Sequence, residues 1–317
     1  MGKVGGGRNF GFGKQMIWAG RQALGERYGE GHFATAAAHA DRWNRFSEWT
    51  KAESGIRDAR DVSIETVTAY AEALAERIRE GSMSVAYAQN LLSTVNVVLE
   101  TLRGDRRIRV APAAAVGDRT HVCAVAPSGL DRDSVRQCAK ALHGNGEVRI
   151  AAVVELAREL GLRLREASML DARGALHQAT THGAVNITTG TKGGRGNRVD
   201  RWVPASEQAV AALRQAALAQ GPGRNLIPPE TSWKQWNNRV HHVWANAREQ
   251  HGLAKLHDLR AAYACERYAA ITGSPAPVVA GHREAGKGMD REARAIIAAE
   301  LGHSRADVVA AYIGSAR

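Results

Sequence analysis

The segment LGHSRADVVAAYI, residues 301–313, is the stretch from which the rest of the chain can be interpreted. Ser304 with Asp307 three residues later is typical of a helix N-terminus, so a helix is predicted to begin there. His303 then precedes the helix, and Tyr312 lies about two turns into it, at 3.6 residues per turn. The segment therefore supplies one imidazole and one phenol whose spacing is set by a helix.

A second segment, LHDLR at residues 256–260, supplies a histidine and an arginine. His257 and Arg260 are three residues apart in a helix predicted over 256–271, so they share one face. Arginine clamps phosphate oxygens through two N–H groups, histidine exchanges protons near neutral pH, and a tyrosine oxygen can act as a nucleophile. Together with His303 and Tyr312, these residue types suit chemistry on a phosphodiester.

Two more cationic residues, Arg163 and Lys192, precede these segments, at a helix junction and in a hairpin tip, where side chains reach the surface. Gly161 ends a helix predicted over 147–160, and Arg163 follows at the junction with the next helix, where it can reach into a cleft. The alternative is that Arg163 only neutralises the last carbonyls of that helix. Alternating residues in 185–189 and 199–203 predict a β-hairpin, and its mobile glycine-rich tip, 190–197, carries Lys192. The tip lacks the spacing and the following helix of a P-loop.

These segments resemble the tyrosine recombinase (phage integrase) family. That family is marked by an arginine in a G-x-R-x-x-E context, a hairpin lysine, H-x-x-R, L-G-H and a final tyrosine. The chain has GLRLRE at 161–166, TKGG at 191–194, HDLR at 257–260, LGH at 301–303, and Tyr312 nine residues after His303. All six positions occur in the family's order, and the resemblance covers roughly residues 130–317.

The resemblance implies a fold and a site. The implied fold class is mainly α with a small β-hairpin or sheet (α+β), with an N-terminal helical core-binding (SAM-like) domain and a C-terminal catalytic domain. The implied catalytic residues are Arg163, Lys192, His257, Arg260, His303 and the nucleophile Tyr312.

The implied chemistry follows the family. Arg163 and Arg260 would grip the scissile phosphate bidentately, and His303 would add a third donor. His257 is the candidate base and Lys192 the acid that protonates the departing 5′ oxygen. Tyr312 would form a 3′-phosphotyrosine without metal or ATP. Four subunits would exchange strands through a Holliday junction, with a possible accessory DNA-bending or directionality protein.

The domain organisation follows from composition along the chain. We predict a flexible basic arm over 1–14, four helices over 15–103, a Gly- and Pro-rich linker over 104–130 and the catalytic domain over 131–317. Residues 272–290 are predicted to be a surface insertion. Only five residues follow Tyr312, which leaves open whether the insertion, the arm or an accessory protein controls a tetramer.

Charge points to a polyanionic partner. The 317 residues carry 43 Lys and Arg against 32 Asp and Glu, a net charge of +11, which suggests double-stranded DNA, although an inert basic protein is the alternative. The alternative for each candidate DNA contact is a solvated surface residue. The candidates are Lys3, Arg8, Lys14, Arg42, Arg45, Arg106, Arg107, Arg195 and Arg198.

Several classes are disfavoured. Three dispersed cysteines argue against a disulfide framework and fit a reducing cytoplasm, and no histidine spacing matches a metal motif, so neither metal nor cofactor is expected. No apolar run approaches ~18 residues and the first residues do not form a secretory signal, so no membrane contact is expected. The resemblance implies a cytoplasmic, bacterial protein associated with DNA in the nucleoid. The alternative functions are a type IB topoisomerase-like nicking and resealing enzyme, a non-catalytic DNA-binding protein on an integrase scaffold, and an unrelated basic helical protein.

Overall fold

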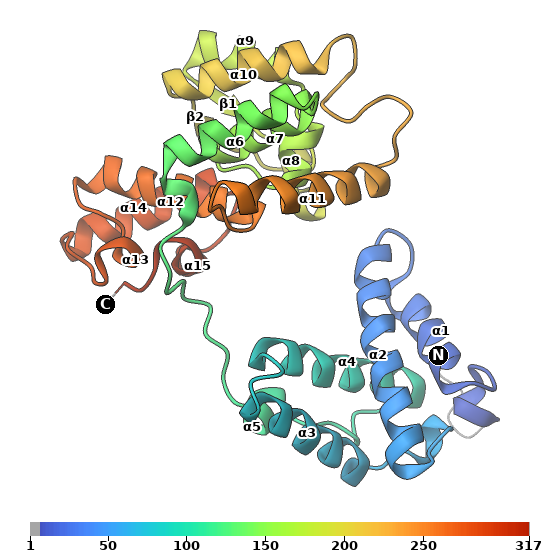
Figure 1. Ribbon diagram of the computed structural model, residues 1–317. Coiled ribbons are helices and arrows are strands. Elements are labelled where there is room, and N and C mark those ends of the chain that lie inside the picture. Colours follow the sequence, from blue (N-terminus) through green and yellow to red (C-terminus); the bar gives the residue numbers. More distant parts are fainter. Residues whose placement is uncertain (1–6, 317) are drawn as a thin grey trace. The chain divides into compact units, whose positions relative to one another are not determined.

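The computed structural model describes residues 7–316, and the chain divides into two compact units between Thr120 and His121 (Figure 1). The N-terminal unit is helical. It contains α1 (Met16–Tyr28), α2 (Phe33–Ser54), α3 (Ile64–Arg79), α4 (Val85–Arg103) and the short α5 (Pro112–Val116). The four helices predicted over 15–103 are therefore present.

Local sequence explains where these helices begin and how they pack. The Ser63 side chain accepts a hydrogen bond from the backbone N–H of Thr66, and Ser84 caps α4 in the same way. Trp43 and Phe46 of α2 are fully buried, and the Trp43 indole donates to the carbonyl of Met16 at 2.9 Å. A Cβ on Gly20 would lie 2.1 Å from that indole, so a glycine in α1 allows α1 and α2 to approach closely.

Residues 7–14 differ from the predicted flexible arm. Asn9 is fully buried; its backbone N–H donates to Asp58 at 2.9 Å, and its side-chain oxygen accepts from Ala59 N–H at 2.7 Å. Asn9 and Phe10 both have positive φ, 51° and 58°, a conformation that non-glycine residues keep only when surrounding contacts hold it. These buried hydrogen bonds override the flexibility expected of the glycines, while Lys3 lies outside the described residues.

The predicted linker over 104–130 is partly folded. α5 packs on α3 and α4, where Val116 joins the apolar core of the N-terminal unit. At the other end, the 3₁₀ turn η3 (Ser128–Leu130) packs against a helix of the C-terminal unit, and Gly129 is buried there. Small and apolar residues in this stretch are therefore used for packing as well as for connection.

The C-terminal unit is also mainly helical. In chain order it holds α6 (Arg132–Gly144), α7 (Val148–Glu159), α8 (Leu164–Met169), α9 (Ala172–His182), α10 (Glu207–Gln220), α11 (Trp233–Gln250), α12 (Leu256–Thr272), α13 (Pro277–Ala280), α14 (Lys287–Glu300) and α15 (Ala310–Ile313). Its sheet is one antiparallel pair, β1 (Ala184–Asn186) and β2 (Trp202–Pro204), with Val185 opposite Val203. The predicted fold class is confirmed.

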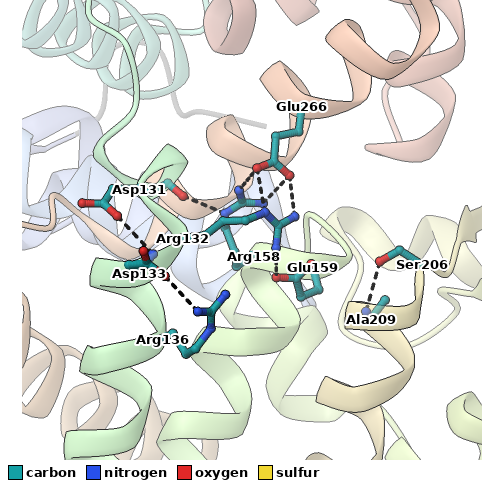
Figure 2. Close-up of polar contacts among 10 residues, drawn as sticks. Asp131, Arg132, Asp133, Arg136, Arg158, Glu159, Ser206, Ala209 and Glu266 are labelled. Carbon is teal, nitrogen blue, oxygen red and sulfur yellow. Dashed lines mark hydrogen bonds and ion pairs between the residues drawn. The ribbon is translucent and has the colours of Figure 1, made fainter.

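Helices α7 and α12 form the centre of this unit. α7 packs on α6, α10 and α12, and α12 also contacts α14 and α15. Figure 2 shows the ion-pair cluster that joins them: Glu266 of α12 accepts from Arg158 of α7 and Arg132 of α6, and Arg132 also pairs with Glu159 at 2.8 Å. α12, which carries His257 and Arg260, is therefore fixed on a buried neighbour.

Three local predictions for this unit differ from the structure. The strands span three residues each, and the hairpin tip folds into the 3₁₀ segment η4 (Lys192–Asn197). The final helical segment begins at Ala306 as the 3₁₀ turn η5 (Ala306–Val309), and Ser304 does not cap it. The predicted insertion, 272–290, is anchored, because Pro277 is buried and Asp290 of α14 accepts from Tyr268 at 2.9 Å.

Candidate active site

Tyr312 is the point on which several functional side chains converge. It lies on α15, where its side chain is 5% exposed. Its hydroxyl is 3.2 Å from His303 Nε2 and accepts a long hydrogen bond, 3.4 Å, from Arg260 Nε. The rings of His257 and His303 have centroids 5.6 and 5.7 Å from that of Tyr312. The structure therefore gathers three of the other five predicted residues around the Tyr312 phenol.

Arg260 is held from three directions. Its side chain is fully buried, and its two terminal nitrogens donate to the carbonyls of Gly161 and Leu301. Burial, and then the nearby charge of Arg163, lower the pKa of Arg260 to about 10. Nε is the nitrogen that donates to the Tyr312 hydroxyl. The bidentate grip of Arg260 on a phosphate stays a prediction.

Arg163 is the more accessible arginine. Its side chain is 25% exposed, and it stands at the junction between α7 and α8, as Gly161 predicted. Its backbone N–H donates to Glu166 at 2.8 Å, and its side chain pairs with the same carboxylate at 2.6 Å. The G-x-R-x-x-E spacing thus places a carboxylate one turn into α8, where it caps the helix and orients Arg163.

Glu166 also pairs with a residue that the sequence analysis did not select. Arg201, at the entry to β2, is 6% exposed; its NH1 lies 2.8 Å from Glu166, and its Nε donates to the carbonyl of Glu300 at 2.7 Å. Burial alone would raise the pKa of Glu166, but the charges of Arg201, Arg260 and Arg163 lower it overall. One carboxylate therefore organises three arginines. The sequence did carry a signal for Arg201: it lies two residues before the buried Val203, so in an extended strand both side chains point to the same, buried face.

A cavity of about 140 Å³ lies beside this cluster. Among its lining residues are Arg163, Lys192, Arg195, Arg201 and His303. Lys192 is exposed on η4. A Cβ on Gly196 would lie 2.2 Å from the Thr188 carbonyl oxygen, so glycine allows the tip to fold back over this cavity. The fifth and sixth predicted residues, Arg163 and Lys192, thus share a cavity with His303.

Both histidines favour the neutral form at neutral pH. Burial, followed by the charges of Arg260 and Arg163, lowers the pKa of His303 to about 4. His257 is exposed at the surface, yet the loss of hydration around its ring and the charges of Arg260 and Arg163 also lower its pKa. A neutral imidazole can accept a proton or donate one N–H, and both abilities are useful beside a phenol and an anion.

The candidate DNA contacts lie mostly at the surface. Arg8, Lys14, Arg45, Arg106, Arg107, Arg195 and Arg198 are exposed, and Arg42 is half-buried. Arg106 pairs with Glu100 at 3.0 Å, and Arg8 lies 4.0 Å from Asp58. Arg195 lines the cavity beside Lys192.

Two other features were searched for within residues 7–316. No cluster of three or more His, Cys, Asp or Glu side chains in this part of the chain could hold a metal ion. Over the same range, every helix is too short or too polar to cross a membrane.

Comparison with known proteins identifies the fold. Residues 117–266 match the family described as integrase. A λ integrase dimer bound to a COC′ core site is 16% identical, with 94% of this chain and 93% of that chain covered and a TM-score of 0.57. The Tn1549 transposon integrase in complex with transposon right end DNA is 12% identical, with 92% and 93% covered and a TM-score of 0.58. A λ integrase tetramer bound to a Holliday junction is 16% identical, with 90% and 73% covered and a TM-score of 0.52.

At these identities, the solved structures show that the chain shares the fold of these integrases. The family match covers residues 117–266, so this segment of the chain is similar to the integrase family. A comparison with curated protein sequences gives no match.

Proposed function

We propose that the chain is a site-specific DNA recombinase that cuts and rejoins double-stranded DNA through a 3′-phosphotyrosine intermediate. The observation that carries this proposal is the Tyr312 hydroxyl, which contacts His303 and Arg260 beside a cavity lined by Arg163 and Lys192. A phenol beside several cationic groups suits attack on an anionic phosphodiester.

The phosphate is held mainly by Arg163 and His303. Arg163 has an accessible guanidinium that Glu166 orients, and His303 offers a neutral imidazole N–H. Arg260 adds Nε close to the phenol oxygen. Such preorganised donors stabilise the charge that develops on the oxygens of the transferred phosphoryl group.

The bond changes balance without a metal or a nucleotide. Tyr312 Oη forms a bond to phosphorus, and its proton passes to His257, whose lowered pKa leaves the imidazole free to accept it. The bond between phosphorus and the 5′ oxygen breaks, and Lys192 donates a proton to that leaving group. The phosphotyrosine ester conserves the free energy of the broken phosphodiester bond. A 5′-hydroxyl of another strand can therefore attack its phosphorus and release Tyr312.

Assembly on DNA follows from strand exchange. Two duplexes exchange strands when four nucleophiles act in pairs, so we propose a homotetramer on DNA, as in the λ integrase tetramer bound to a Holliday junction. The N-terminal unit acts as the core-binding domain and supplies Arg8, Lys14, Arg42 and Arg45, while Arg106, Arg107, Arg195 and Arg198 follow the phosphates. An accessory DNA-bending protein and a bacterial, nucleoid-associated location belong to the same proposal.

The test is covalent capture. Nicked duplexes from a library of mobile-element ends are incubated with the protein and separated on a denaturing gel. We expect a protein–DNA adduct that disappears when Tyr312→Phe is tested and persists in Tyr28→Phe, a matched loss of a hydroxyl in the N-terminal unit. An adduct that survives Tyr312→Phe, or a tightly bound crossover site that never yields an adduct, would overturn the proposal.

A further inference from the structure

A second cavity, of about 440 Å³, shares Arg163 with the cavity described above and no other lining residue. It lies between the loop that follows α7, the C-terminal half of α11 and the start of α12. Its lining includes His241, Trp244, Arg248, Lys255 and His257. Nothing in the proposed chemistry uses His241, Arg248 or Lys255.

The charge of this cavity has one sign. Three cationic side chains, Arg163, Arg248 and Lys255, line it together with two imidazoles, and no carboxylate does. Asp258, which adjoins His257 in the sequence, does not line the cavity, and it accepts from the Ser128 hydroxyl at 2.8 Å and from Gly129 N–H at 3.1 Å. Arg163 is paired with Glu166, but Arg248 and Lys255 form no ion pair among the described residues. Cations without a counter-ion favour the binding of an anion.

Two further observations point to a ligand. The Nε atom of Arg248 is buried and has no hydrogen-bond partner among the described residues. Helix α12 begins at Leu256, and three successive residues at its N-terminus, 255–257, line the cavity. The first N–H groups of a helix are unsatisfied within it and favour negative charge.

The position of the cavity identifies the anion as part of DNA. The His257 ring that lines it has its centroid 5.6 Å from that of Tyr312, and Arg163 borders both cavities. A strand that places one phosphate at Tyr312 carries a further negative charge every 3.4 Å of rise along the helix axis. Trp244 is buried and its indole donates to the Ala254 carbonyl at 3.1 Å, so it forms a wall and does not offer a face for a base.

We propose that this cavity binds a second phosphodiester, next to the one that Tyr312 attacks, through Arg248 and Lys255. This inference rests on the proposed function. Two anchored phosphates fix the direction of the strand through the site as well as its position, which aligns the scissile bond with the Tyr312 oxygen.

The experiment pairs protein variants with DNA in which single phosphates are neutral. The duplex is the crossover site recovered by covalent capture or, without an adduct, the tightest-binding duplex from the same library. Methylphosphonates replace, one at a time, the three phosphates on each side of the cleavage position or of the duplex centre. The affinity for each duplex and the rate of adduct formation are measured for the wild type and for Arg248→Gln/Lys255→Gln.

We expect one neighbouring position at which the neutral phosphate weakens wild-type binding about tenfold, the effect of one lost charge-assisted contact. The double variant should bind unmodified DNA about tenfold more weakly and show no additional loss at that position. Arg248→Lys/Lys255→Arg, which keeps both charges, should restore most of the sensitivity. Arg239→Gln, an exposed residue of the same helix paired with Glu147, should behave as the wild type.

The outcomes separate this inference from the proposed function. Equal losses in the double variant at every position, or no loss at all, would overturn the second phosphate site even if adducts form normally. Position-specific coupling in binding without any adduct would support the site and overturn the phosphotyrosine chemistry. Thermal melting of each variant verifies that the fold is intact.

Discussion

The two units of the chain use charge in opposite ways. In the described part of the N-terminal unit, Asp58 is the one buried charged residue. Through residue 316, the C-terminal unit buries seven charged side chains: Arg158, Glu166, Arg201, Arg260, Asp290, Arg294 and Glu300. The first unit has an apolar core and leaves its cations at the surface, where they can meet a polyanion. In the second unit, burying charged side chains costs free energy of folding, but the ion pairs and hydrogen bonds of these side chains fix their positions.

This contrast predicts unequal tolerance to the loss of an arginine. Arg260→Met should destabilise the C-terminal unit by about 3–5 kcal/mol, because the carbonyls of Gly161 and Leu301 lose their partners and Glu166 loses a counter-charge. Adduct formation should vanish as well. Urea unfolding, followed by circular dichroism, measures the difference in the free energy of unfolding.

The matched control for Arg260→Met lies in the other unit. Arg45→Met removes an exposed guanidinium from α2 and should leave the urea transition nearly unchanged. If both variants shift the transition equally, the proposed difference between the two units is wrong.

The pH dependence of cleavage tests whether the buried charge of Arg201 acts on the site. Its charge is among the causes that hold the pKa of His303 down to about 4, after burial and the charges of Arg260 and Arg163. His303 is neutral above its pKa, so cleavage that needs the neutral imidazole falls as pH drops through that value. Arg201→Met removes a repelling charge, raises this pKa, and should shift the acidic limb of single-turnover cleavage to higher pH.

Arg195→Met is the control for this pH profile. Arg195 lines the same cavity but is not among the charges that lower the pKa of His303, so its loss should leave the acidic limb in place. An unmoved limb in Arg201→Met, or an equal shift in both variants, would mean that Arg201 serves only as a packing group.

The smallest effect concerns the surface charges of the N-terminal unit. Arg42→Gln/Arg45→Gln should weaken binding to any duplex and reduce the slope of log affinity against log salt by about 2, since each lost phosphate contact removes about 0.9. Stability should be unchanged. Arg136→Gln, an exposed residue of α6 paired with Asp133, should leave the slope as it is, and an equal slope in all three proteins would remove α2 from the DNA interface.

Local patterns in the sequence were sufficient for most of the helices and for the residues around Tyr312. Gly161, with φ of +60°, ends the segment before Arg163 as predicted, and the side chains of Ser84 and Asp131 cap α4 and α6. Such signals work because capping and helix termination depend on neighbours in sequence.

Features fixed by distant partners were not predictable in the same way. Residues 7–14 appear flexible in sequence, yet Asn9 is held by Asp58, 49 residues away. In the sequence, Arg201 is an ordinary strand residue, and its partners Glu166 and the Glu300 carbonyl are known only from the fold. Ser304 is a residue type that often caps helices, but the 3₁₀ segment begins at Ala306, two residues after Ser304.

The clamp around Arg260 makes the last segment of the chain part of the framework of the site as well as the source of Tyr312. Arg260 joins Gly161 and Leu301, and Tyr312 arrives in sequence after every other residue of the site. Loss of the segment from Leu301 onward would therefore remove a carbonyl partner of Arg260 as well as Tyr312 itself.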